Sequence, residues 1–105
     1  MIIPKDAIIA IEKVRDYLLK PRIKHDKSGF LRLAGYEREQ YEILLNDIRD
    51  QFLPSEAQFQ ERKKYGEYYA IRGFLQGPNG RQLRVKTVWI VDLQGDIRFV
   101  TLVPN

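Results

Sequence analysis

The sequence predicts an α+β domain in which three N-terminal helices pack on one face of a four-stranded antiparallel β-meander. Apolar residues recur at helical spacing through the first half of the chain, and in the second half the period becomes that of strands. Gly-bearing turns separate the strand segments. Helices followed by consecutive hairpin-linked strands are typical of the α+β class.

The first helix is predicted from an apolar stripe near the N-terminus. Ile11, Val14 and Leu18 recur at spacings of three and four residues, which places them on one helix face. Tyr17 lies beside that face, and Pro21 ends the helix from outside because proline cannot continue it.

The second and third helices differ in length. The second is a short apolar cluster at 30–34, with Asp26 or Ser28 as the cap at its start. Gly35 is expected to supply the left-handed residue at its end. The third helix covers 41–52, where one face is apolar and the other carries charged residues typical of a solvated surface.

The second half is predicted to contain strands at 65–75, 82–91 and 97–103, with a further strand at 57–63. Two turns of the same form fix the register, because in each a glycine fits the left-handed position of a three-residue loop. The expected cross-strand pairs are Tyr69–Trp89, Ile71–Thr87, Leu75–Leu83, Trp89–Phe99 and Thr87–Thr101. We expect the hydroxyls of Thr87 and Thr101 to bond each other across the strands.

This register divides the strand residues between two faces, since successive side chains point to opposite sides. One face is apolar and is expected to lie under the helices: Tyr69, Ile71, Leu75, Leu83, Val85, Trp89, Val91, Phe99 and Val103. The other mixes basic, aromatic and aliphatic side chains: Tyr68, Arg72, Phe74, Arg84, Lys86, Val88, Ile90, Arg98, Val100 and Leu102.

Composition excludes several function classes. With 105 residues, the chain is expected to form a single domain over 1–105. The absence of cysteine excludes disulfides, zinc knuckles and thiol nucleophiles, and a single histidine excludes a His-rich metal site, so no metal or cofactor is expected. The longest apolar run, Ala7–Ile11, is too short to cross a membrane. We therefore expect a cytoplasmic protein that does not engage membranes.

Charge patterning points to polyanions. The formal net charge is +4, and five basic residues face one acid, Asp26, between residues 20 and 32. This stretch either attracts a polyanion or is a solvated loop. Basic side chains interleaved with aromatic ones on the open sheet face suit a nucleic-acid backbone and its bases. There are three alternatives for this face: a homodimer contact, a contact with a partner protein, or an open surface whose apolar groups are shielded by long Arg side chains.

Several segments resemble a family of small uncharacterised bacterial domains that is frequent in cyanobacteria. They are Lys13–Leu19, Lys27–Leu31 with Gly35-Tyr36, Gly77–Arg81, Val85–Ile90 and Arg98–Thr101. The order of elements is also similar to that of the barnase–EndoU–colicin–RelE group of metal-independent ribonucleases. That resemblance implies a toxin-type ribonuclease, usually neutralised by a small antitoxin-like partner. Residues 22–26 depart from the family, which has a glycine-containing loop there, so a derivative that only binds RNA is also expected.

Metal-free RNA cleavage needs a proton acceptor, a proton donor and cations for the phosphate. The candidate catalytic residues are His25, Lys27, Lys86 and Arg98, because imidazole titrates near neutrality and lysine and arginine match phosphate charge. The candidate nucleic-acid-binding residues are Lys24, Tyr68, Arg72, Phe74 and Arg84. The alternative function is a non-catalytic protein-interaction module that uses the same face, or the loop at 20–32, to bind itself or another protein.

Overall fold

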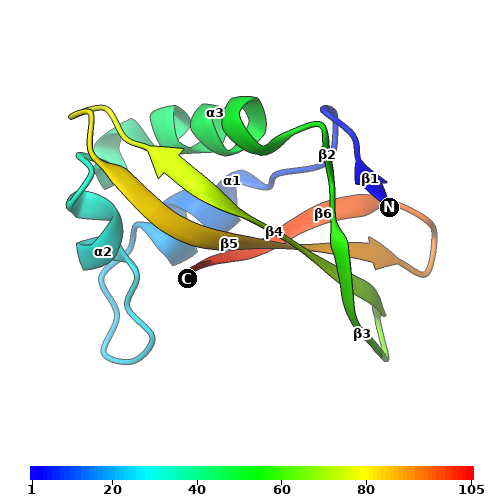
Figure 1. Ribbon diagram of the computed structural model, residues 1–105. Helices are drawn as coiled ribbons and strands as arrows, with labels where there is room; N and C mark the ends of the chain where they lie inside the picture. Colours follow the sequence, from blue (N-terminus) through cyan, green and yellow to red (C-terminus); the bar gives the residue numbers. More distant parts are fainter.

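In the computed structural model, which describes residues 1–105, the helices are followed by a twisted antiparallel sheet of order β3-β4-β5-β6 (Figure 1). Its strands are β3 (Gln58–Lys63), β4 (Gly66–Gln76), β5 (Gln82–Asp92) and β6 (Ile97–Pro104). A second sheet, absent from the sequence prediction, pairs β1 (Ile2–Ile3) with β2 (Ser55–Glu56). The α+β class and the four-stranded meander are thus confirmed.

The helical half is more irregular than predicted. The first helix is α1 (Ile11–Lys13) continued by the π-helix η1 (Val14–Leu18), and the 3-10 turn η2 (Arg38–Gln40) leads into α3 (Tyr41–Phe52). The second helix, α2 (Ser28–Arg32), is little more than one turn.

The expectation that three helices pack together on one sheet face is therefore wrong in part. The long helix α3 packs against β4 and η1, and α1 lies against β6. By contrast, α2 lies at one end of the molecule (Figure 1). α2 ends at Arg32, and Gly35, at the end of the turn that follows, has the predicted left-handed conformation with a φ of 93°.

The predicted register between β4 and β5 is confirmed at every pair named. Tyr69 lies opposite Trp89, Ile71 opposite Thr87, and Leu75 opposite Leu83. On the other face the same register places Arg72 opposite Lys86 and Phe74 opposite Arg84. Both predicted turns close as expected. The Gly77 amide donates to the Arg81 carbonyl at 2.9 Å, and the Asp92 amide donates to the Asp96 carbonyl at the same distance. The turn glycines, at 80 and 95, both have a φ of 86°.

A bulge changes the register between β5 and β6. Trp89 lies opposite Phe99 as predicted, but Val88 lies opposite Thr101, so Val100 is an extra residue on β6. The predicted pairing of Thr87 with Thr101 is wrong, because Thr87 lies opposite Leu102. Beyond the bulge each side chain changes face. As a result Leu102 is fully buried, whereas Val103 leaves the helix-covered side and lies opposite Lys86.

The core lies between the helices and the face that carries Trp89. Trp89 is fully buried and packs edge-to-face on Phe99 at 5.3 Å between ring centroids. Its indole N–H donates to Thr87 Oγ1 at 2.9 Å, and Thr87 donates to the Ile71 carbonyl at 3.2 Å. The expected Thr87–Thr101 hydroxyl pair therefore does not form, and the Thr87 hydroxyl is instead hydrogen-bonded to the Trp89 indole.

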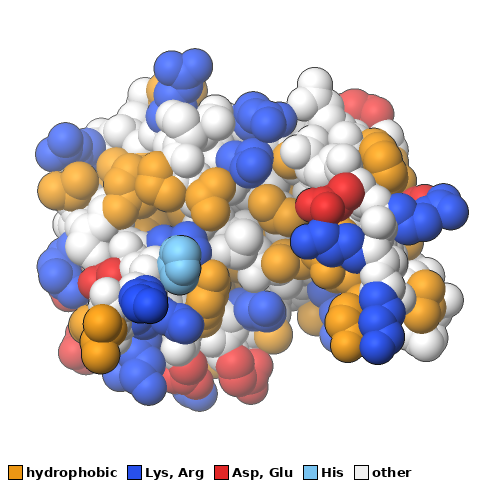
Figure 2. Space-filling model, turned by 90° about the horizontal axis from the view of Figure 1, so that it is seen from below, with side chains coloured by type: hydrophobic (Ala, Val, Ile, Leu, Met, Phe, Trp, Pro, Cys, Tyr) orange, Lys and Arg blue, Asp and Glu red, His pale blue; other side chains and the backbone are white.

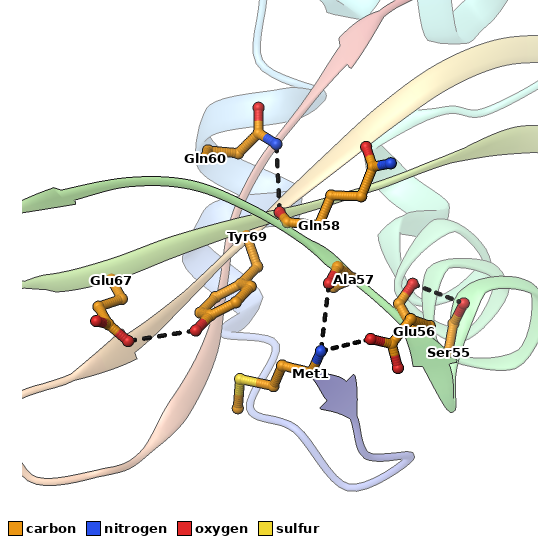
Figure 3. A network of polar contacts seen from close by, with 8 residues as sticks. All are labelled: Met1, Ser55, Glu56, Ala57, Gln58, Gln60, Glu67 and Tyr69. Carbon is orange, nitrogen blue, oxygen red and sulfur yellow. Dashed lines mark hydrogen bonds and ion pairs between the residues drawn. The ribbon is translucent and has the colours of Figure 1, made fainter.

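The short strands β1 and β2 lie side by side where the chain leads into the edge strand β3 (Figure 3). The Met1 ammonium contacts Glu56 Oε1 at 2.6 Å and the Ala57 carbonyl at 3.5 Å, which holds β1 beside β2. Nearby, the Tyr69 hydroxyl donates to Glu67 Oε1 at 3.2 Å. Because the Met1 ammonium and Glu56 are partly exposed, their ion pair contributes at most about 1 kcal/mol. None of the helices has the length and apolar character needed to cross a membrane.

Candidate functional site

A polar cluster joins the first helix, the basic loop and the edge strand of the sheet. Lys27 Nζ donates to the Tyr17 hydroxyl at 2.9 Å, and both side chains are partly buried. The hydroxyl also lies close enough to Thr101 for that side chain to affect its ionisation. We call Tyr17, Lys27 and Thr101 the Tyr17 cluster.

The Tyr17 cluster favours a negative charge on the phenol. The hydrogen bond from Lys27 lowers the pKa of Tyr17 most, followed by the nearby hydroxyl of Thr101, while burial acts in the opposite direction. The positive charges of Lys27 and Arg22 lower the pKa further. Arg22 and Lys27 both lie 4.8 Å from the centre of the Tyr17 ring, and Lys13 lies 5.8 Å away. The phenol is thus surrounded by cations, without a carboxylate hydrogen-bonded to it.

Thr101 has an unusual polar environment. Its Oγ1 is buried but makes no hydrogen bond of good geometry, even with the neighbouring Tyr17 hydroxyl. Thr101 reaches this position because the bulge at Val100 turns it toward the face that carries Lys86 and Val88. Buried hydroxyls are normally hydrogen-bonded, so this oxygen has unused donor and acceptor capacity.

The loop before α2 brings Lys27 into the Tyr17 cluster. Asp26 Oδ1 accepts hydrogen bonds from the Ser28 amide at 2.8 Å and the Ser28 hydroxyl at 2.6 Å, which fixes the turn that leads into α2. The only acidic side chain of the basic stretch, Asp26, is therefore hydrogen-bonded within the loop itself. The N-cap of α2 is Lys27 and has no side-chain cap, so the expected cap by Asp26 or Ser28 does not form. His25 has a φ of 56° and an exposed side chain. Lys24 is also exposed.

Seen from the side of this loop, the surface is basic. Figure 2 shows the chain's one histidine among Lys and Arg side chains, with hydrophobic side chains reaching the same surface. Ile23 is the most exposed hydrophobic residue, at 102% relative accessibility. The loop, which lies below the sheet in Figure 1, is therefore a projecting segment with an apolar tip between basic residues.

The remaining candidates divide into two groups on the open sheet face. Arg72, Phe74, Arg84 and Lys86 lie together, because Arg72 is opposite Lys86 and Phe74 is opposite Arg84. Lys86 is a diagonal neighbour of Thr101 across β5 and β6, so the structure places it next to the Tyr17 cluster.

Tyr68 and Arg98 lie toward the opposite end of this face. Arg98 is opposite Ile90, about 13 Å along β5 from Lys86. Its guanidinium pairs with Asp92 at 3.2 Å and with Asp96 at 3.4 Å. The structure therefore does not bring Arg98 together with Lys27 and Lys86, and two carboxylates already neutralise it.

Comparison with known proteins identifies the family. A family model described as a domain of unknown function, DUF6883, matches residues 4–105. The chain belongs to the DUF6883 family. No curated protein matches the sequence of this DUF6883 chain.

The fold of this DUF6883 chain is found in a bacterial complex. It is similar to one chain of a contact-dependent growth inhibition toxin–immunity protein complex from Klebsiella pneumoniae 342, with a TM-score of 0.68. The alignment covers 94% of this chain and 100% of that chain at 18% sequence identity. At this identity the likeness establishes a shared fold.

Sequence reasoning missed two members of the Tyr17 cluster in this DUF6883 domain. Tyr17 is predicted as a neighbour of the helix face, and Thr101 as a buried partner of Thr87. A signal was available, since Tyr17, Lys27 and Thr101 all lie in segments that carry the family resemblance. What the pattern could not supply is their proximity, which depends on the bulge and on the path of the loop.

Proposed function

We propose that this DUF6883 domain is a metal-independent ribonuclease of the toxin type, with the Tyr17 cluster as its reaction centre. The observation that carries the proposal is the contact between Lys27 and the Tyr17 hydroxyl beside the unpartnered Thr101 oxygen. A lowered pKa increases the fraction of Tyr17 that is phenolate, which is the form that accepts a proton, and adjacent cations stabilise charge on a phosphate.

The proposed reaction uses the 2′-hydroxyl of RNA as the nucleophile. The Tyr17 phenolate takes the proton of that hydroxyl, and the 2′-oxygen forms a bond to the adjacent phosphorus. Lys27 and Lys86 stabilise the additional negative charge on the phosphate. The bond from phosphorus to the 5′-oxygen then breaks, and the imidazolium of His25 protonates the leaving oxygen. The products are a 2′,3′-cyclic phosphate and a 5′-hydroxyl.

Thr101 is proposed as a positioning residue for Tyr17. Its hydroxyl helps to lower the pKa of Tyr17 and has capacity for one further partner. A hydroxyl donor of the substrate would bind the free lone pairs of Thr101 Oγ1 and would place the ribose next to the phenol.

A small acidic protein partner is part of the proposal. The similar fold occurs in a complex of a toxin with an immunity protein. In this chain, Lys20, Arg22 and Lys24 are exposed beside the Tyr17 cluster, and none of them forms an ion pair. An acidic surface placed over this loop would match its charge and would block access to Lys27.

The function is tested with purified protein and a mixed RNA substrate in the presence of EDTA. We expect cleavage with cyclic-phosphate ends, loss of about 100-fold or more in rate for Lys27→Ala and Tyr17→Phe, and a near wild-type rate for the matched control Lys20→Ala. Intact RNA at micromolar wild-type protein would refute the proposal. Equal rates for Lys27→Ala and the wild type would do so as well.

A non-catalytic interaction module is the second candidate, and the exposure of Ile23 favours it. A large apolar side chain that is 102% accessible at the tip of a basic loop is suited to a pocket in another protein or a second copy. Light scattering of the wild type and Ile23→Ser tests self-association. A dimer that Ile23→Ser disrupts, together with intact RNA, would favour this function over the ribonuclease.

A further inference from the structure

A second basic and aromatic group lies on the open face, beyond Lys86 from the Tyr17 cluster. Phe74 is 61% exposed and lies directly opposite Arg84 on the neighbouring strand. Arg72 is the next residue of β4 on the same face and lies opposite Lys86. We call Arg72, Phe74 and Arg84 the Phe74 platform.

The charges of the Phe74 platform are uncompensated. Neither Arg72 nor Arg84 forms an ion pair, and Arg72 donates only to the Gln58 side chain, at 3.0 Å. Like charges directly opposite each other, such as Arg72 and Lys86, destabilise a sheet. Cations held together without acids at a cost in stability are a feature of surfaces that bind polyanions.

The surface is hollowed beside the Phe74 platform. A cavity of about 240 Å³ is lined by Arg72, Gly73, Phe74, Arg84 and Asn105. This is smaller than the roughly 300 Å³ at which small-molecule pockets begin. An exposed phenyl ring beside two guanidinium groups offers a stacking surface for a base and contacts for its phosphates.

The distance to the Tyr17 cluster fits an extended strand. Arg84 is four residues from Val88, the residue opposite Thr101, which corresponds to about 13 Å along β5. Lys86 lies between them on the same face, so cations continue from one group to the other. A duplex would hide its bases from Phe74, whereas a single strand can stack one base on the ring.

We propose that the Phe74 platform binds an unpaired nucleotide that flanks the scissile phosphate, which makes single-stranded RNA the substrate. This inference rests on the proposed function for its RNA, but the platform itself is a binding site that needs no chemistry. It can therefore be tested with a strand that lacks the 2′-hydroxyl and cannot be cleaved by the proposed reaction.

The test is fluorescence anisotropy with a labelled 12-nucleotide oligodeoxythymidylate and with a duplex of the same length. We expect Phe74→Ala to weaken single-strand binding by roughly 5- to 150-fold and Phe74→Tyr to restore it, because stacking needs only a ring. The matched control is Tyr65→Ala, which removes a 65% exposed ring outside the platform and should leave binding unchanged.

Salt dependence separates stacking from phosphate contact. Arg84→Gln should reduce the slope of log K against log salt by about 0.7, the value for one phosphate of a single strand. Phe74→Ala should weaken binding without changing that slope. Circular dichroism verifies that each variant is folded, which the exposure of Phe74 and Arg84 leads us to expect.

Equal binding by Phe74→Ala and the wild type would overturn the inference, as would tighter binding of the duplex. Self-association that Phe74→Ala abolishes, with no oligonucleotide binding, would assign this face to a second copy of the chain instead. Platform-dependent binding without RNA cleavage would confirm the Phe74 platform as a single-strand binding site and refute the ribonuclease. RNA cleavage by the wild type, together with oligonucleotide binding that Phe74→Ala does not weaken, would support the ribonuclease and refute the Phe74 platform.

Discussion

Thr87→Val isolates one buried hydrogen-bond chain in the core. Thr87 and Trp89 are both fully buried, and valine has the shape of threonine without its hydroxyl. The substitution removes the acceptor of the Trp89 indole N–H and the donor to the Ile71 carbonyl. A buried donor without a partner costs about 1–3 kcal/mol, so we expect the free energy of unfolding to fall by that amount.

The measurement is urea unfolding monitored by far-UV circular dichroism. Tryptophan fluorescence is unsuitable because the chain's one tryptophan, Trp89, is itself replaced in the double-mutant cycle described next. In a chain of this size the expected loss corresponds to a decrease in Tm of at least about 4 °C. Trp89→Phe serves as the second mutation, since it removes the indole N–H. Thr87→Val should cost much less in that background, with a coupling of about 1 kcal/mol or more.

Two results would refute this reasoning. A loss below about 0.5 kcal/mol for Thr87→Val would place it among ordinary surface substitutions. An equal loss in the wild-type and Trp89→Phe backgrounds would mean that the Thr87 hydroxyl does not support the indole. Thr87→Ser provides the positive control, because it keeps the hydroxyl and removes only a methyl group.

Three further predictions follow from the contacts. Gly77→Ala places a methyl group against the Ala34 carbonyl, so unfolding should become easier by about 1–3 kcal/mol, whereas Gly29→Ala, which meets nothing within 4 Å, should not destabilise. Hydrogen bonds from Arg15 and Arg38 lower the pKa of Asp16 from 3.8 to about 2. The ionised Asp16 therefore stabilises the fold above pH 3.8, and this contribution is lost as the pH falls toward 2. Acid unfolding of Asp16→Asn should lack that loss of stability. If Tyr17 is the base, activity rises with pH through the pKa of Tyr17. Because Lys27→Ala raises that pKa, the ascending limb of the pH–rate profile should move to higher pH.

The strand register could be predicted because its determinants are local. Gly80 and Gly95 occupy the left-handed positions that the two turns require, and each turn fixes the pairing of the strands beside it. The prediction failed only where a residue is inserted, at Val100. A bulge has no clear signature in a strand that alternates well, so the sequence placed Leu102 and Val103 on the wrong faces.

The candidate site could be predicted only in part for a related reason. Lys86 and the Phe74 platform share a face through the register, and the sequence grouped them correctly. Lys27 was found from its charge, but its partner Tyr17 lies ten positions earlier along the chain. Contacts of this kind depend on the path of a loop, which the pattern of apolar residues does not describe.

The sequence alone determined the α+β class, the turns and the face that buries Trp89, because turn geometry and alternation act over a few residues. Tertiary structure decided the rest. It brought Lys27 to Tyr17, turned Thr101 toward them, and neutralised Arg98 with two acids. The physical reason is that hydrogen bonds and ion pairs between distant segments depend on three-dimensional distance, which local propensities do not specify.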